Sequence, residues 1–339
     1  MFRPLILLGF LLVLSGSQLL ADDAKSPGVT VETRHDSIDF RIGKELVACY
    51  RKGVAKPYFW PLTAPGGVQI TRAWPMVRGT PGESNDHFHQ KSAWFCHGDI
   101  IPDGIELKHH IKGIEGVDFW SEADGHGRIV CTDSIDRLDA DNPGHGYVLT
   151  TNEWRTADDV KVLDEKRAIH LYSLGDARLF VFEIDLEASV CPLTFVDTKE
   201  GSFGVRVNDA IREEKGKGKI ENADGKTGEK NCWGRISAWC DYSGTIEGKT
   251  AGIAIFADPK NPYPSCWHVR GYGLMAANPF GREKSGFPDM KGKKDLVKLA
   301  KGEHLLLRYG ILLHKGDAKE GKVAEMYEQF VKLKGKSVN

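Results

Sequence analysis

The sequence predicts an all-β protein, a large antiparallel β-sandwich that ends in one helix. Short runs of alternating or β-branched residues recur along the chain, and turn residues separate them. Helical periodicity is clear only near the C-terminus. No repeat of fixed period is visible in the 339 residues, which argues against a propeller or a solenoid.

The expected strands are assigned from period-two alternation and from their content of Val, Ile, Thr and aromatic residues. Turn signals between them include Pro65-Gly66-Gly67, Asn142-Pro143-Gly144 and Asp258-Pro259. In chain order, the expected strands are 29–33, 38–42, 67–71, 128–132, 147–154, 167–172, 179–186, 251–256 and 304–313.

One surface helix is expected at the end of the chain, because an apolar stripe with spacing i, i+3, i+4, i+7 and i+8 packs a helix against a sheet. The stripe consists of Val323, Met326, Tyr327, Phe330 and Val331. Three stretches rich in Lys, Gly or other polar residues have little apolar surface to bury and are expected to be exposed loops. They are 215–219, 222–230 and 281–294.

The first 21 residues have the layout of a secretory signal peptide. Arg3 precedes the apolar run 5–14, and Ala21 stands before the acidic pair Asp22-Asp23. The run is too short to span a bilayer, and no later segment reaches the ~20 apolar residues of a membrane helix. We therefore expect an exported protein, periplasmic or extracellular. Its mature chain, residues 22–339, is expected to form a single β-sandwich domain with no membrane span.

Composition excludes several classes of function. Lys plus Arg number 46 against 47 Asp plus Glu, so the chain has no basic excess for binding nucleic acid. No Gly-x-Ser-x-Gly elbow and no glycine-rich nucleotide loop are present, which argues against a lipase-type hydrolase, a kinase and a dehydrogenase. The seven cysteines are widely spaced, and their odd number leaves at least one thiol free. Cys232 and Cys240 are the nearest pair for a disulfide, which export permits.

The densest group of reactive side chains lies in residues 86–99, DHFHQKSAWFCHGD. His87 and His89 are two residues apart, so on an extended segment both point to one face. They can contact a substrate there, or they can bind zinc or iron together with a third ligand. The cofactor expectation is therefore either none or a divalent metal. The candidate metal ligands are Asp86, His87, His89 and His97.

Two other segments supply groups that chemistry on a sugar needs. Glu200 follows an apolar strand in Asp197-Thr198-Lys199-Glu200-Gly201, where a cleft or Lys199 could tune its pKa for acid or base work. His268 and Arg270 have the same parity in Trp267-His268-Val269-Arg270, so on a strand they face one side, as a base and an anion holder do. The alternatives are a surface Glu in a charged turn and an ordinary salt bridge.

Short motifs distributed over residues 50–314 resemble the bacterial methane oxygenase PmoA-like family. They are KPYFWP (56–61), ITR (70–72), DHFH (86–89), WFCHGD (94–99), GVDFW (116–120), DTKEG (197–201), WHVR (267–270) and ANPFG (277–281). The resemblance implies an exported protein of polysaccharide-degrading bacteria with a β-supersandwich similar to galactose mutarotase. A membrane oxygenase activity is not expected, because the mature chain offers no spanning helix.

The family pattern reads Asp-His-Pro-His-His-Arg-Gly, and this chain departs from it at Phe88, Gln90, Lys91 and Ser92. Gln90 cannot titrate near neutral pH or replace an imidazole as a base. Either the second His of that pair is dispensable, or this member has an altered substrate or reduced activity.

The combined observations predict an exported carbohydrate-active enzyme, an epimerase, lyase or hydrolase that uses His/Glu acid–base chemistry on a sugar or glycoside. The alternatives are a metal-dependent oxygenase or hydrolase centred on the His-x-His, and a non-catalytic carbohydrate-binding protein. The first hypothesis requires the candidate residues to converge in one cleft. The catalytic candidates are His87, His89, Glu200 and His268; the substrate-binding candidates are Arg72, Trp94, His97, Asp99, Trp120, Asp197, Arg206, Arg270 and Asn278.

Overall fold

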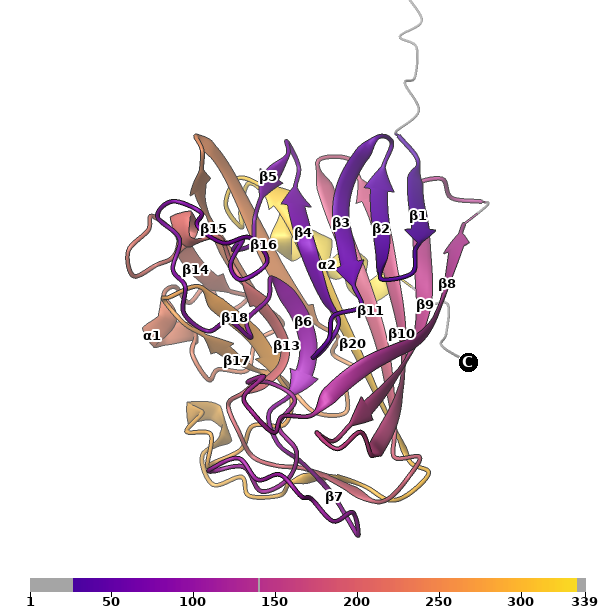
Figure 1. Ribbon diagram of the computed structural model, residues 1–339. Helices are drawn as coiled ribbons and strands as arrows, with labels where there is room; N and C mark the ends of the chain where they lie inside the picture. The colour runs from indigo at the N-terminus through magenta and orange to yellow at the C-terminus, as the bar shows by residue number, and fades with distance from the viewer. Residues whose placement is uncertain (1–26, 140, 334–339) are drawn as a thin grey trace, which may run out of the picture.

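The computed structural model describes residues 27–139 and 141–333. Two large antiparallel sheets face each other, and a small sheet lies at one end of the molecule (Figure 1). The predicted all-β sandwich with a C-terminal helix is therefore confirmed. The predicted signal peptide, residues 1–21, lies outside the described residues.

The first sheet begins as a meander of neighbouring strands and then joins segments that are distant in the sequence. Within it, β6 and β13 pair in the register Gly201↔His97 to Val205↔Ala93, which sets Lys199 and Glu200 beside the end of β6. Its order is β1 (Val29–Thr33), β2 (Ser37–Ile42), β3 (Glu45–Arg51), β4 (Tyr58–Ala64), β6 (Ala93–His97), β13 (Gly201–Arg206), β18 (Leu274–Asn278) and β17 (Cys266–Val269), with β5 (Val68–Gln69) paired to β4.

The second sheet contains the longest strands. Its order is β14 (Lys219–Asn222), β15 (Trp239–Ile246), β16 (Lys249–Ala257), β20 (His304–Lys315), β11 (Ala177–Glu187), β10 (Lys161–Leu174), β9 (His145–Arg155) and β8 (Arg128–Leu138). The small sheet has the order β19 (Val297–Leu299), β12 (Leu193–Phe195) and β7 (Ile100–Pro102). The helices are α1 (Glu229–Cys232) and α2 (Val323–Lys332), with short 3₁₀ turns at Asp209–Ile211 and Pro288–Met290.

Aromatic side chains from both sheets meet in the core between them. Phe59 of β4 contacts Phe180 and Phe182 of β11, with ring centroids 5.4 and 5.6 Å apart. Each buried Phe side chain contributes roughly 1.5–3 kcal/mol of transfer free energy. On the opposite face of the second sheet, α2 packs Phe330 against Phe256, as the predicted apolar stripe requires.

All nine predicted strands overlap observed ones, although 67–71 contains only the two-residue β5. Eleven of the twenty strands in the described residues are not among the nine expected; in two of these, β6 and β18, every residue is buried and burial does not alternate. The loop 281–294 was expected to be exposed, yet Phe287 and Met290 are buried in it and pack near Cys266. The sequence lacks a periodic signal there, since a loop needs only one or two apolar anchors.

The seven cysteines all lie within the described residues and are free thiols, so no pair, including Cys232 and Cys240, forms a disulfide here. Within residues 27–139 and 141–333, no helix is long and apolar enough to cross a membrane.

Candidate functional site

A cleft of about 560 Å³ lies beside the ends of β6, β13 and β17. The alternating direction of the side chains along β6 shows that this cleft lies on the outer face of the first sheet. Phe95 points into the core, where it contacts Trp154 of the second sheet, so the neighbouring Trp94 points outward and packs on Trp120. The lining residues are His87, His89, Gln90, Gly98, Ile111, Lys112, Ile114, Asp118, Trp120, Ser121, Lys199, Glu200, His268, Arg270 and Tyr272.

All four catalytic candidates line this cleft. They come from three distant parts of the sequence: the loop before β6, the turn before β13, and β17. Two substrate-binding candidates line it with them, Trp120 and Arg270. The structure thus brings together the residues that the acid–base hypothesis requires in one place. The catalytic candidates are His87, His89, Glu200 and His268.

Glu200 and His268 have opposite electrostatic behaviour in this cleft. Burial raises the pKa of Glu200, and nearby Lys199 offsets only part of that effect. Burial, together with the positive charges of Arg270 and Lys199, lowers the pKa of His268 to about 3. The site therefore pairs a carboxyl group that holds its proton to higher pH with an imidazole that is neutral in ordinary buffers.

Both ring nitrogens of His268 are buried without a hydrogen bond of good geometry to a described protein group. The side chain is 1% exposed. The backbone of Lys199 lies near the ring and raises the pKa of His268 slightly, but it does not form a hydrogen bond of good geometry with the ring. An unpaired buried polar atom costs about 1–3 kcal/mol, so a ligand that bonds to His268 removes this penalty.

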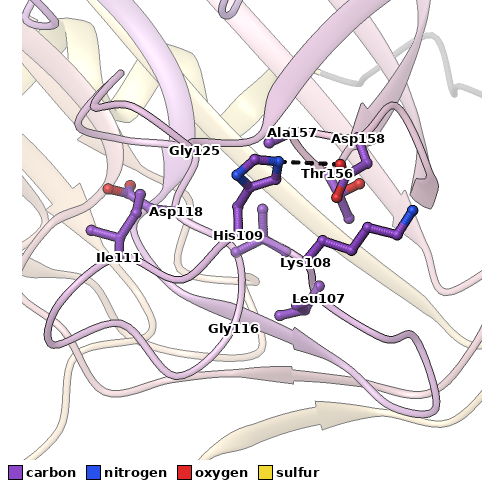
Figure 2. Close-up of a pocket in the computed structure, with 11 residues that line it drawn as sticks. Leu107, Lys108, His109, Ile111, Gly116, Asp118, Gly125, Thr156, Ala157 and Asp158 are labelled. Atoms are coloured by element: carbon purple, nitrogen blue, oxygen red, sulfur yellow. Dashed lines mark hydrogen bonds and ion pairs between the residues drawn. The ribbon is translucent and has the colours of Figure 1, made fainter.

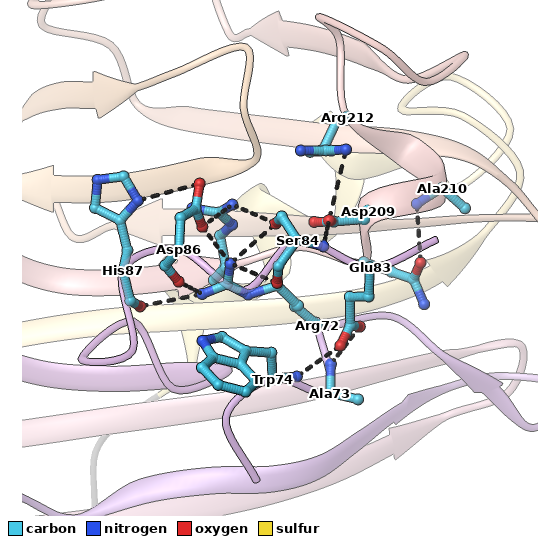
Figure 3. A network of polar contacts seen from close by, with 12 residues as sticks. Arg72, Ala73, Trp74, Glu83, Ser84, Asp86, His87, Asp209, Ala210 and Arg212 are labelled. Atoms are coloured by element: carbon cyan, nitrogen blue, oxygen red, sulfur yellow. Dashed lines mark hydrogen bonds and ion pairs between the residues drawn. The ribbon is translucent and has the colours of Figure 1, made fainter. Parts of the chain in front are cut away.

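The loop that carries His87 is held by two buried arginines, Arg72 and Arg206, of which Figure 3 labels Arg72. Arg72 and Arg206 both bind Asp86 Oδ1, at 2.5 and 3.0 Å. Burial would raise the pKa of Asp86, but Arg206 and Arg72 hold it below its usual value. Arg72 also donates to the carbonyl of His87 at 3.1 Å, which fixes that residue in a left-handed conformation with φ 42°.

The neighbouring His89 is also a neutral imidazole. Burial is the main cause of its low pKa, about 3, and Lys56 and His87 lower it further. Its ring centroid lies 5.7 Å from that of His87 and 6.4 Å from that of Trp120. The His-x-His pair thus faces the cleft as two adjacent rings, one half-exposed and one largely buried.

Tyr272 is a cleft residue that sequence reasoning missed. Its ring stacks on His87, and the guanidinium of Arg206 lies 4.7 Å from its centroid. Gln90, noted in the sequence only as a departure from the family pattern, accepts a hydrogen bond from Arg206 at 2.7 Å and donates one to the Tyr272 hydroxyl at 3.5 Å. The proximity of Tyr272 to the His268-Val269-Arg270 segment was an available signal, whereas nothing in the sequence marks Gln90 as a partner of Arg206.

Several substrate-binding candidates instead hold the loops around the cleft. Asp197 accepts hydrogen bonds from the backbone N–H groups of Arg282 and Ser285, at 2.6 and 3.0 Å. Asp99 accepts them from Glu115 and Gly116, at 2.9 and 2.7 Å. Their carboxylates are therefore engaged by the protein. Neither residue lines the cleft, and the same holds for Arg72, Trp94, His97, Arg206 and Asn278.

Asn278 and His97 also bond to backbone groups. Asn278 Oδ1 accepts from the N–H groups of Phe280 and Gly281, both at 2.9 Å, and its Nδ2 donates to the carbonyl of Thr198. His97 Nε2 lies 2.9 Å from the carbonyl oxygen of Val196, and its ring packs on Phe280. Both residues therefore support the turn that carries Glu200.

The candidate metal ligands do not form a cluster. His97 is engaged at Val196, away from the adjacent rings of His87 and His89. Asp86 shares its Oδ1 between two arginines, and its Oδ2 lies 3.3 Å from His87 Nδ1. Among the residues that the structure describes, no group of three or more His, Cys, Asp or Glu side chains is arranged to hold a metal ion.

Figure 2 shows a second recess, which shares Ile111 and Asp118 with the cleft. Its volume is only about 10 Å³, too small for a sugar. His109 Nε2 lies there 3.2 Å from Asp158 Oδ1. This contact ties the loop that carries Ile111 and Lys112 to the turn between β9 and β10.

The fold and the cleft define a β-sandwich protein whose cleft brings acid–base side chains together. The chain belongs to a family of unknown function, DUF6807, which matches residues 37–328. A search of curated proteins finds no match. The resemblance to the PmoA-like family stays a prediction.

Solved structures with similarity to this chain include three sugar-active or related proteins. A GH36 α-galactosidase, AgaB from Geobacillus stearothermophilus, has 10% identity and a TM-score of 0.42 over 86% of this chain and 42% of its own. A galactose mutarotase-like protein from Clostridium acetobutylicum has 10% identity and a TM-score of 0.41, and the match covers 86% of this chain and 99% of that protein. Galactose 1-epimerase from Lactobacillus acidophilus NCFM has 10% identity and a TM-score of 0.36, and the match covers 85% of this chain and 98% of that protein.

The chain spans about two fifths of the length of the α-galactosidases that it matches. At these identities and TM-scores, the similarities assign no activity to it.

Proposed function

We propose that this protein binds a sugar or glycoside in the cleft and transforms it by acid–base chemistry, as an epimerase, lyase or hydrolase. The observation that carries the proposal is the meeting of Glu200 and His268 in one cleft with His87 and His89. We propose further that the protein is exported, in line with its N-terminal sequence. The similarities to solved structures have TM-scores below 0.5, so the proposal rests on the cleft.

Glu200 acts in this proposal as the proton donor. Its raised pKa keeps the carboxyl group protonated at a pH where an ordinary Glu is ionised. The proton goes to a sugar oxygen whose bond to carbon breaks, or to a ring carbon in an epimerisation. Glu200 is then left as a carboxylate beside Lys199, which stabilises the negative charge.

His268 acts as the proton acceptor. Because its pKa is about 3, the ring is neutral and one nitrogen carries a free lone pair. That nitrogen takes the proton from a sugar hydroxyl, from water or from a C–H group next to a carbonyl. Trp120 supplies an apolar ring in the same lining, of the kind that packs on the C–H face of a sugar.

Proton NMR with a panel of neutral, uronic and oxidised glycosides, with and without added Zn²⁺ or Fe²⁺, tests the proposal. We expect anomer exchange, new reducing ends or new vinyl protons for at least one sugar. Glu200→Gln and His268→Ala are each expected to reduce that rate at least a hundredfold. The matched controls are Glu328→Gln on the exposed face of α2 and His35→Ala in an exposed turn, which leave the rate unchanged. Folded protein that changes no sugar in the panel contradicts the proposal.

A further inference from the structure

We infer that the sugar bound in the cleft carries a negatively charged group, in the first place a carboxylate, and that Arg270 and Lys199 bind it. The inference rests on the proposed function, because it assigns a substrate class to the same cleft.

The side chains of the lining carry an excess of positive charge. The cations are Lys112, Lys199 and Arg270, against the acids Asp118 and Glu200. The Asp118 carboxylate is already engaged: its Oδ1 accepts from the backbone N–H groups of Trp120 and Ser121, at 2.6 and 3.1 Å. Arg270 is paired with Glu229, so the lining cations without an acidic partner among the described residues are Lys112 and Lys199.

Neither lysine has a protein partner. Among the described residues, the ammonium groups of Lys112 and Lys199 form no ion pair within 4.0 Å and no hydrogen bond. Most other charged groups near the cleft are paired, as Lys56 and Lys91 are with Glu122. Lys199 lies next to Glu200 in the sequence, so an anion bound to Lys199 is held close to the proposed proton donor.

Arg270 is oriented by protein groups that leave the end of its guanidinium open. Its Nε donates to Glu229 Oε1 at 2.7 Å, and Glu229 Oε2 accepts from the backbone N–H of Gly271 at 2.5 Å. The ring of Tyr272 lies 5.6 Å from the guanidinium carbon. Neither Nη1 nor Nη2 has an acceptor among the described residues. Two parallel N–H groups held in one plane match the two oxygens of a carboxylate.

His268 completes the anion site with a neutral donor. It lies on β17, two residues before Arg270, both residues line the cleft, and neither ring nitrogen of His268 makes a hydrogen bond of good geometry to a described protein group. A ring that donates one N–H to the anion keeps its other nitrogen as a proton acceptor. A carboxylate therefore meets a planar cation, a flexible ammonium group and a neutral donor within one cleft.

Isothermal titration calorimetry of the folded protein with matched glycosides tests the inference. Methyl glucuronide is compared with methyl glucoside, and methyl galacturonide with methyl galactoside, because each pair differs only at C6. We expect at least one uronide to bind at least tenfold more tightly than its neutral partner at low ionic strength. That preference is expected to fall severalfold when salt is raised from about 20 to 200 mM.

Arg270→Gln is expected to remove most of the uronide preference, measured as the ratio of the uronide and neutral-sugar affinities. Lys199→Gln is a second variant, which replaces Arg270→Gln if that protein does not fold, because Lys199 is exposed. It is expected to remove a smaller part of the uronide preference than Arg270→Gln does. The matched control is Arg128→Gln, whose exposed guanidinium pairs with Asp159 away from the cleft. Sugar 6-sulfates are tested in the same way. If a sugar sulfate binds more tightly than a uronide and Arg270→Gln loses that binding, the cleft is an anion site whose preferred ligand group is a sulfate.

Equal or tighter binding of the neutral sugar overturns the inference and leaves the proposed function standing. A uronide preference that survives in both Arg270→Gln and Lys199→Gln overturns the assignment of the site to these residues. Failure of every glycoside to bind overturns the inference and the proposed function together.

Discussion

The imidazole of His87 stacks on the phenol ring of Tyr272, with ring centroids 5.1 Å apart and an interplanar angle of 6°. His87 belongs to the loop before β6, and Tyr272 to the turn between β17 and β18. Arg206, buried beneath the loop, contacts the same tyrosine ring. One aromatic side chain thus connects the His-x-His loop with the segment that carries His268 and Arg270.

Replacing Tyr272 tests whether this connection stabilises the site. Tyr272→Ala removes a stacked ring pair and a cation–π contact, so we expect the free energy of unfolding to fall by about 1–3 kcal/mol. Tyr272→Phe keeps both contacts and loses only the 3.5 Å hydrogen bond from Gln90, so a fall of less than about 1 kcal/mol is expected. Urea denaturation at neutral pH measures both values. Equal destabilisation by the two variants contradicts a role for the ring.

The pH dependence of turnover reports the state of Glu200. As a proton donor it must be protonated, so kcat/KM is expected to fall as pH rises through its pKa, which burial raises above the ordinary value of 4.5. His268, with a pKa of about 3, must be unprotonated and limits the rate only in strongly acidic buffer. Residual turnover in Glu200→Gln is expected to lack the alkaline fall. A rate that rises instead through the same range identifies Glu200 as a base.

Gly98 is a position where a single methyl group should displace the proposed proton donor. A Cβ at this site lies 2.7 Å from the carbonyl oxygen of Glu200 and 2.9 Å from its Cβ, closer than the backbone can tolerate. Gly98→Ala is therefore expected to lower turnover at least tenfold, because about 1 Å of misplacement can cost a hundredfold. Gly28→Ala is the control, since its Cβ meets only the carbonyl oxygen of Pro143 at 3.5 Å. Wild-type turnover in Gly98→Ala contradicts the placement of Glu200.

A buried pair outside the cleft predicts how stability depends on pH. His314 Nε2 lies 2.8 Å from Asp241 Oδ2. Burial opposes the charged form of His314, but Asp241 outweighs burial and raises its pKa above the ordinary 6.5. Because the folded-state pKa is the higher one, the pair stabilises the fold fully below pH 6.5 and loses that contribution as pH rises through the raised value.

His314→Gln keeps a hydrogen-bond donor but has no titrating group, so its stability should change less over this range. We expect it to be about 1.5–3 kcal/mol less stable than the native chain at pH 6, with a difference that shrinks at higher pH. Denaturation curves from pH 6 to 9 measure the difference. A constant difference across the range contradicts the charged pair.

Local pattern was sufficient for the fold class and for the types of side chain that could perform chemistry. Period-two alternation marks β1 and β9, where one face is buried and the other is more exposed, and a spacing of three and four residues marks α2. The same pattern cannot mark β6 or β18, because loops cover their outer face and every residue is buried.

The choice among candidate residues depended on how distant segments pack. Asp197 and Glu200 are three residues apart in one motif, yet Asp197 binds the backbone N–H groups of the 282–285 loop while Glu200 lines the cleft. His97 and His87 share one segment, yet His97 bonds to Val196 and His87 stacks on Tyr272. A sequence specifies which groups are present; strand register and the loops that cover a sheet decide which of those groups the protein itself satisfies and which stay open to a ligand.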